Sequence, residues 1–196
     1  MISSKPLEKP AAPGTAIDVG GLERSLALEI MERTGEDIRR CYHCGSCANG
    51  CPFVEAMDYP ANAVLRLIQF GMRRQALECS TIWLCVGCHS CSSQCPMAID
   101  IAAVMDALRQ MALEDGAAVP QPDILTFHQE VLRSLKRYGR THKLGIMWRH
   151  KLLTRRWFSD VDVGLKLLVK RKLDLKPSRI RALGEIGPFF NAPKGE

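Results

Sequence analysis

Apolar residues recur along this chain at the three- and four-residue spacing of an amphipathic helix. No stretch shows the strict apolar–polar alternation expected of a half-buried strand. The helical stripes are formed by Leu22, Leu26 and Ile30, by Val64, Leu65, Ile68 and Met72, by Ile101, Val104, Met105, Leu108 and Met111, and by Ile124, Phe127, Val131, Leu135 and Tyr138. The pattern predicts an all-α fold.

Residues that start and stop helices support this prediction. Gly35 suits the C-cap of the first helix, Pro60 the first turn of the second, and Asp100 the N-cap of the third. The stretch "VDVGLKLLVKRKLD" at residues 161–174 adds another amphipathic segment.

Composition divides the chain into three parts. Residues 1–19 are rich in Pro, Ala, Ser and Lys and lack periodicity, which predicts a disordered N-terminal tail. The stretch "EDGAAVPQP" at residues 114–122 interrupts the helical pattern. We therefore expect one helical domain at residues 20–118 and a basic helical C-terminal extension at residues 119–196.

Charge is distributed unevenly between the two halves of the chain. Residues 1–125 carry 10 Lys and Arg against 15 Asp and Glu, whereas residues 126–196 carry 17 against 6. The basic half is typical of a solvated helical face or of a surface that docks on another subunit. Nucleic acid is not the expected partner, while "WRHKLLTRRWF" at residues 148–158 leaves peripheral membrane contact open.

The chemistry of this chain is concentrated in its cysteines. No apolar run approaches the ~20 residues of a membrane span, and no signal-peptide core is visible at the N-terminus, so we expect a cytoplasmic protein. The 9 cysteines are odd in number and densely spaced. In a reducing compartment such a pattern indicates metal binding rather than disulfides.

Eight cysteines form two copies of one motif, "CYHCGSCANGCP" at residues 41–52 and "CVGCHSCSSQCP" at residues 85–96. The C-x2-C-x2-C-x3-C-P run is the signature of bacterial two-cluster ferredoxins, in which the fourth cysteine binds the other cluster. The motif predicts two 4Fe–4S clusters with crossed ligation. The expected ligands are Cys41, Cys44, Cys47 and Cys95 for cluster 1, and Cys85, Cys88, Cys91 and Cys51 for cluster 2.

Structural zinc is the alternative, but paired C-x2-C sites explain neither the third cysteine at the same interval nor the terminal Cys-Pro. Cys79 fits neither motif and is expected to be a buried apolar thiol, with an interface or redox thiol as the alternative. His43 and His89 are expected to be loop side chains that are able to tune a cluster, and Trp83 a packing anchor. No dinucleotide-binding motif and no nucleophile–base pair is visible, so we expect no catalytic residue in this chain.

The helical surroundings of the motifs resemble an α-helical ferredoxin domain. The segments "TIWLCVGCHSCSSQCPMAIDIAAVMDALR", "FHQEVLRSLKRYGR" and "LKLLVKRKLDLKPSRI" are similar to the C subunit of heterodisulfide reductase. The resemblance implies two 4Fe–4S clusters that relay electrons between a flavin- and cluster-bearing subunit and a cysteine-rich, disulfide-active subunit, within a hetero-oligomer. For this family the implied substrate is the coenzyme M–coenzyme B heterodisulfide in methanogens, or sulfur bound to a lipoate-carrying protein in a related complex of sulfur-oxidising bacteria. The helical C-terminal region and the lack of membrane spans in the sequence favour the second.

Two other functions stay open from the sequence. The chain suits the iron–sulfur subunit of a membrane-associated dehydrogenase that passes electrons toward quinone. A zinc module that binds nucleic acid through the basic C-terminal region is the third alternative.

Overall fold

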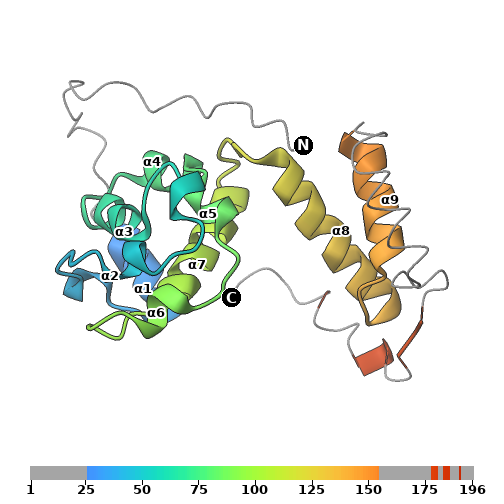
Figure 1. Ribbon diagram of the computed structural model, residues 1–196, viewed down its shortest axis with the longest axis horizontal. Helices are drawn as coiled ribbons and strands as arrows, with labels where there is room; N and C mark the ends of the chain where they lie inside the picture. The colour runs from blue at the N-terminus through green and yellow to red at the C-terminus, as the bar shows by residue number, and fades with distance from the viewer. Residues whose placement is uncertain (1–25, 155–177, 181–182, 186–189, 191–196) are drawn as a thin grey trace. The chain divides into compact units, whose positions relative to one another are not determined.

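The computed structural model describes residues 26–154, 178–180, 183–185 and 190. Within them every regular element is a helix, which confirms the predicted all-α fold (Figure 1). The chain divides into two compact units, residues 1–121 and 122–196. The predicted tail at residues 1–19 and the amphipathic segment at residues 161–174 lie outside the described residues.

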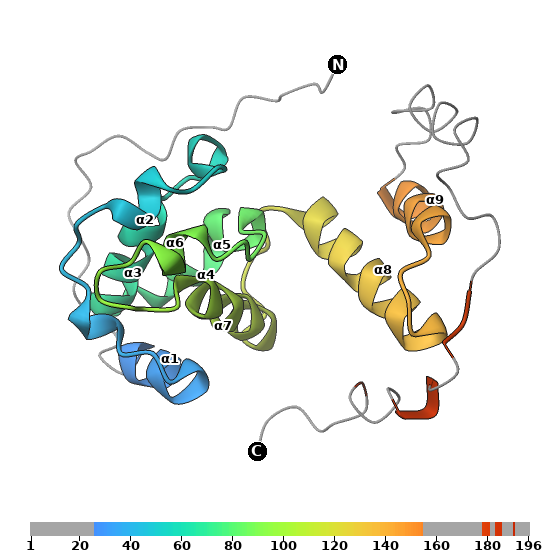
Figure 2. The same cartoon turned by 60° about the horizontal axis from the view of Figure 1, so that its bottom comes forward.

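The first unit is organised around its longest helix, α7. This helix contacts α1, α4 and α5, while α3 contacts α1 and α4; Figure 2 shows α1 and α7 side by side. The elements of this unit are α1 (Leu26–Thr34), η2 (Ile38–Arg40), α2 (Ser46–Asn49), η3 (Val54–Ala56), α3 (Ala61–Gln69), α4 (Arg73–Glu78), α5 (Thr81–Leu84), α6 (Ser90–Ser93) and α7 (Ile101–Glu114).

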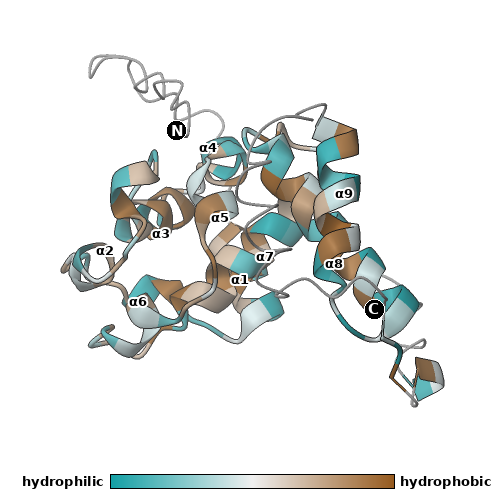
Figure 3. Ribbon diagram, turned by 45° about the vertical axis from the view of Figure 1, so that its right-hand side comes forward, coloured by the Kyte–Doolittle hydropathy of each residue, from teal (hydrophilic) through white to brown (hydrophobic). Residues whose placement is uncertain are grey.

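The core of the first unit consists of the predicted apolar stripes. Figure 3 shows apolar residues concentrated along α1, α3 and α7. The fully buried stripe residues are Leu26, Ile30, Val64, Leu65, Ile68, Ile101, Val104, Met105, Leu108 and Met111. The predicted caps also form, because Gly35 is left-handed at φ 75° and donates to Met31 O, and Asp100 accepts from Ala103 N.

The apolar stripe predicted at residues 64–72 extends past the end of α3. Met72 was expected on the same face as Ile68, but α3 ends at Gln69 and Gly71 adopts φ 68°. A left-handed glycine ends a helix at no steric cost, so the chain turns there and Met72 instead precedes α4.

Arg73 ties three helices of the first unit together. Its guanidinium contacts Glu29 on α1 at 2.6 Å and Asp115, just past the end of α7, at 2.8 Å. The hydrogen bonds to Asp115 and Glu29 raise the pKa of Arg73. An arginine on α1, Arg33, contacts Glu114 at 2.8 Å.

The second unit contains α8 (Pro122–Tyr138) and α9 (Lys143–Thr154), which pack on each other. Apolar and polar residues alternate along both helices (Figure 3). The most buried residues of α8 are Glu130 and Ser134 rather than its apolar stripe. Glu130 accepts from Arg149 Nε on α9 at 2.7 Å, and this ion pair explains how a carboxylate is tolerated there.

Candidate metal centre

The two cysteine motifs fold into loops with the same backbone conformation. Residues at the second and fourth positions after the first cysteine are left-handed in both loops, with φ 66° at His43, 81° at Gly45, 63° at Gly87 and 58° at His89. Glycine and histidine exchange places between the two copies. Alternation of left-handed and ordinary residues turns successive backbone N–H groups inward, which makes a concavity that suits an anion or an iron–sulfur cluster.

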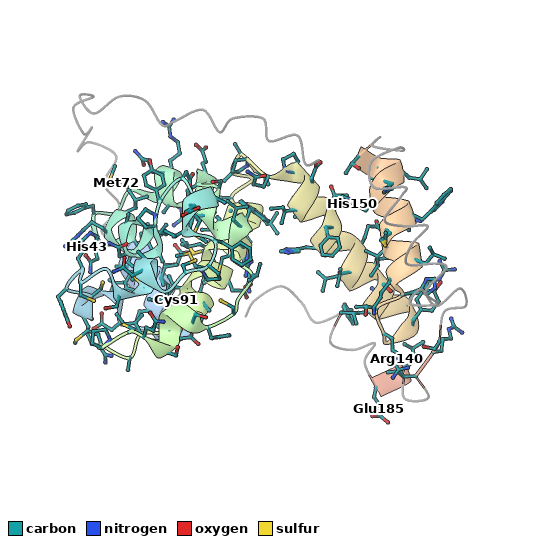
Figure 4. The ribbon with its side chains drawn as sticks, viewed as in Figure 1. His43, Met72, Cys91, Arg140, His150 and Glu185 are labelled. Atoms are coloured by element: carbon teal, nitrogen blue, oxygen red, sulfur yellow. The ribbon has the colours of Figure 1, made fainter. Side chains whose placement is uncertain are left out.

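A one-turn helix follows each loop and carries the third cysteine of the motif. These helices are α2 and α6, and they contain Cys47 and Cys91. The two helices contact each other, so the two loops lie side by side. Figure 4 labels His43 and Cys91 within the first unit.

Four cysteines from both motifs line one cavity. Its walls include Cys41, Cys44 and Cys47 from the first motif, together with Cys95 from the second. Cys51 is not among the lining residues, although it belongs to the first motif. The grouping is the one expected for cluster 1 from the crossed ligation pattern.

The cavity also receives the first turns of two helices. Asn62 and Leu65 of α3 and Ile101, the first residue of α7, contribute to its walls. Helix N-termini carry a partial positive charge, which favours an anionic group bound beside them.

Two contacts link the first motif to the segment around Cys95. The Arg40 guanidinium donates to the carbonyl oxygen of Met97. Gly50, which precedes Cys51, lies against the side-chain amide of Gln94, which precedes Cys95, and a Cβ at Gly50 would overlap that amide. The two fourth cysteines are therefore held close together, in the place where the two motifs exchange ligands in the crossed pattern.

None of the expected cluster 2 ligands lines this cavity. Arg109 of α7 donates to Cys85 O at 2.9 Å. Cys91 and Cys51 are half-buried, and Cys88 is exposed. Burial raises the pKa of Cys47 to about 11, and the Cys41 and Cys91 thiols add to the shift.

The second cysteine of each motif has its own hydroxyl partner. Cys44 Sγ lies 3.4 Å from Ser46 Oγ, and Cys88 Sγ lies 3.5 Å from Ser90 Oγ. The hydrogen bonds with these serines lower the pKa of Cys44 and of Cys88, because a hydroxyl that donates to a thiolate favours the charged form. Since the thiolate is the metal-binding form of cysteine, the lowered pKa values favour Cys44 and Cys88 as cluster ligands.

Asp58 connects the first motif to the helix that leads into the second. It accepts from Ser80 N at 2.7 Å and from Thr81 N at 3.0 Å, at the start of α5. Burial alone would raise the pKa of Asp58, but the hydrogen bonds from Thr81 and Ser80 outweigh it and lower the pKa. Asp58 was not predicted as a functional residue, although an aspartate a few residues past a cysteine motif, in a segment without helical periodicity, is a signal that is visible in the sequence.

The remaining candidates have ordinary surroundings. Cys79 is buried as predicted, and its thiol contacts Ala76 O at 3.3 Å. His43 Nε2 lies 3.2 Å from Asn62 Nδ2, and His89 Nδ1 lies 3.4 Å from Asp100 Oδ1. Trp83 is buried beside Cys85, which fits the predicted packing role.

The donor set fits iron–sulfur clusters. A cube distributes its four thiolates over four irons. The cysteine-lined cavity, the inward-turned backbone and the helix N-termini supply what such an anionic group requires.

Residues 37–99, which include all eight motif cysteines, match the 4Fe–4S dicluster domain family. The domain therefore holds two 4Fe–4S clusters, as the motif predicts. Among the described residues, no helix combines the length and the apolar character needed to cross a membrane.

The chain is also similar to curated proteins. It is 32% identical over 119 residues to a protein of Archaeoglobus profundus that is named as like the C subunit of heterodisulfide reductase, and the match covers 60% of each chain. It is 30% identical over 150 residues to the C subunit of the ferredoxin:CoB-CoM heterodisulfide reductase of Methanosarcina acetivorans, which covers 76% of this chain and 55% of the relative. Over 101 residues it is 26% identical to the C subunit of the H(2):CoB-CoM heterodisulfide,ferredoxin reductase of Methanothermobacter marburgensis, which covers 52% of this chain and 55% of the relative.

These likenesses confirm the resemblance to the C subunit of heterodisulfide reductase. The chain spans between about half and three fifths of the length of these relatives.

Proposed function

We propose that this chain is the electron-transfer subunit of a heterodisulfide-reductase-like complex. It relays electrons between a flavin- and cluster-bearing subunit and a cysteine-rich subunit, where the disulfide chemistry takes place. The observation that carries the proposal is the cavity lined by Cys41, Cys44, Cys47 and Cys95, because it draws its fourth cysteine from the other motif.

A relay is favoured over a purely structural role by the arrangement of the two motifs. A 4Fe–4S cube supplies one-electron chemistry with little rearrangement of its ligands. The contact between α2 and α6 and the close approach of Gly50 to Gln94 support two clusters held close together. Two adjacent clusters with exposed outer loops suit transfer from one partner to another, since Cys44 and Cys88 both face solvent.

The second unit is proposed to dock on another subunit of the complex. Glu130 holds Arg149 at 2.7 Å and Arg133 at 3.3 Å, so two guanidiniums are fixed on one face. Trp148 of α9 and Leu132 of α8 are exposed apolar residues in the same unit. Arginine and tryptophan are enriched at the energetic centres of protein interfaces.

In the proposed complex the terminal substrate is bound by a partner subunit and not by this chain. The names of the relatives refer to the CoB–CoM heterodisulfide, while the helical C-terminal region of this chain favours lipoate-bound sulfur in a sulfur-oxidising complex. We propose the latter, with the heterodisulfide as the alternative outcome of identifying the partners.

The test is anaerobic purification of the tagged full-length chain from its native host, followed by identification of the attached subunits and metal analysis. We expect about eight iron and eight acid-labile sulfides per chain. We also expect a flavin subunit and a cysteine-rich subunit to co-purify.

Two results would contradict the proposal. A colourless, zinc-loaded protein would exclude electron transfer by this chain. Co-purification with a dehydrogenase and a membrane cytochrome, without a cysteine-rich subunit, would favour electron transfer toward quinone instead.

A further inference from the structure

Asn62 occupies an unusual position for an amide side chain. It is the second residue of α3 and lines the cavity together with Cys41, Cys44, Cys47 and Cys95. The remaining walls contributed by α3 and α7 are apolar, from Leu65 and Ile101. Asn62 is therefore the polar side chain that α3 and α7 present to this cavity, in addition to Ser46 of α2, which lies 3.4 Å from Cys44 Sγ.

The two ends of the Asn62 amide have different surroundings. Nδ2 lies 3.2 Å from His43 Nε2. Oδ1 is buried and has no hydrogen-bond partner among the described residues. A buried acceptor without a donor costs free energy, and thiolates or cluster sulfides beside it would also be acceptors.

Exchanging the oxygen and nitrogen of the Asn62 amide gives His43 an acceptor and removes the buried oxygen that lacks a donor. The two atoms are nearly indistinguishable in shape, so their assignment rests on the hydrogen-bond partners. After the exchange, Oδ1 accepts from the Nε2–H tautomer of His43. The NH2 group then takes the place of the unpartnered oxygen, where it is able to donate.

We propose that Asn62 donates a hydrogen bond to the cluster held by Cys41, Cys44, Cys47 and Cys95, and that this bond raises the reduction potential of that cluster. His43 acts through Asn62 as a positioning residue. This inference rests on the proposed ligation of cluster 1. The physical reason is that reduction adds negative charge to the cluster, and a donor to its sulfur atoms stabilises the reduced form more than the oxidised form.

The start of α7 brings no amide to this cavity, since its first residue, Ile101, lines the cavity and its second residue is Ala102. The amide of Asn62 is therefore expected to make cluster 1 easier to reduce.

The test is a redox titration of the full-length protein, with the clusters followed by electron paramagnetic resonance. Asn62→Leu removes the donor and keeps a side chain of similar size. We expect the equilibrium constant for reduction of one cluster to fall about tenfold, the size of one hydrogen bond to a charged group. For a one-electron couple a tenfold change is about 59 mV.

Asn49→Leu is the matched control. Asn49 lies in the first motif but is exposed and does not line the cavity, so both potentials should stay at their wild-type values. Iron and sulfide content is measured for each variant, so that a change in potential is read only from protein with both clusters present.

Asn62→Asp is the second variant, in case the leucine prevents cluster binding. It keeps the size of the side chain and replaces the donor by a negative acceptor, so the same potential should fall at least as far. Unchanged potentials in a fully loaded Asn62→Asp protein would overturn the inference and leave the proposed function intact. A wild-type protein without iron–sulfur clusters would instead refute the proposed function itself.

Discussion

Replacing Asp58 by alanine removes the hydrogen bonds that join the two cysteine motifs. The carboxylate accepts from Ser80 N, Thr81 N, Thr81 Oγ1 and Tyr59 N, at 2.7, 3.0, 2.7 and 2.9 Å. Tyr59 N and Thr81 Oγ1 keep other partners after the substitution, because they bond with each other and Thr81 Oγ1 also donates to Tyr59 O. The N–H groups of Ser80 and Thr81 lose the acceptor that the carboxylate provides.

The magnitude follows from these two N–H groups. A hydrogen bond to a charged acceptor contributes about 1.5–3 kcal/mol, and water is able to replace part of it at this half-buried site. We therefore expect Asp58→Ala to lower the free energy of unfolding by about 3 kcal/mol. For a chain of this length, 1 kcal/mol corresponds to about 2–4 °C in the melting temperature, so the expected loss is about 6–12 °C.

The assay is anaerobic thermal unfolding of the cluster-loaded protein, followed by circular dichroism and by the visible absorbance of the clusters. Because Asp58 holds the start of α5, and α5 leads directly to Cys85, cluster 2 should be lost before cluster 1. Glu78→Ala is the control, since Glu78 pairs at 3.9 Å with Arg74 on its own helix, an arginine whose side chain is 81% exposed, and the substitution should change the melting temperature little.

The lowered pKa of Asp58 also determines how its contribution to the free energy of unfolding changes with pH. The folded-state pKa of Asp58 is lowered, so its contribution is fully present above the unfolded value of about 3.9 and is lost only as pH falls through the folded value. The difference in the free energy of unfolding between the wild-type protein and Asp58→Asn should therefore stay constant between about pH 6 and pH 8. A melting temperature of Asp58→Ala that equals that of the Glu78→Ala control would contradict the proposed role of the Asp58 hydrogen bonds.

Three further substitutions test other contacts. Arg73→Gln should lower the melting temperature by several degrees because it releases α1 from α4 and the end of α7, whereas Arg74→Gln, whose side chain is 81% exposed, should have almost no effect in the same assay. Gly50→Ala should reduce iron content by pushing against Gln94, and the added substitution Gln94→Ala should restore it; iron analysis that shows no rescue would contradict the close approach. Cys79→Ala should retain both clusters, and alkylation of the native protein near pH 7 should not modify Cys79, because burial raises the pKa of its thiol to about 12.

Much of the first unit follows from local patterns. The apolar stripes at residues 26–30, 64–68 and 101–111 identify the helix faces that form its core, because burial of one face dominates helix stability in a protein. The motif spacing likewise identifies the ligands by chemical type. Both signals are short-range and repeat along the chain, which is why they are visible without a structure.

The contacts that join distant segments are not visible in the same way. Arg40 with Met97 and Asp58 with Ser80 connect residues far apart in sequence, and no periodicity marks them. The left-handed residues His43 and His89 are a related case. Each loop also has a left-handed glycine, Gly45 or Gly87, and glycine is typical of a turn. Histidine in the left-handed conformation is uncommon, and it depends on the surrounding loop.

The second unit departs furthest from its pattern. Its apolar stripe is only partly buried, while Glu130 and Ser134 are the buried residues of α8. Ser134 donates to Arg140 O and accepts from His142 N, so it satisfies the turn that joins the two helices. A hydrophobicity pattern cannot register a polar residue that is buried because it completes a turn.

In the proposed crossed ligation, the fourth cysteine of each motif binds the cluster of the other motif. The most direct test compares electron paramagnetic resonance spectra of the reduced variants Cys51→Ser, Cys88→Ser and Cys44→Ser, with Cys79→Ser as the control that keeps both signals. Crossed ligation predicts that Cys51→Ser loses the same signal as Cys88→Ser, although Cys51 is closer in sequence to Cys44. A spectrum of Cys51→Ser that matches the spectrum of Cys44→Ser would contradict crossed ligation.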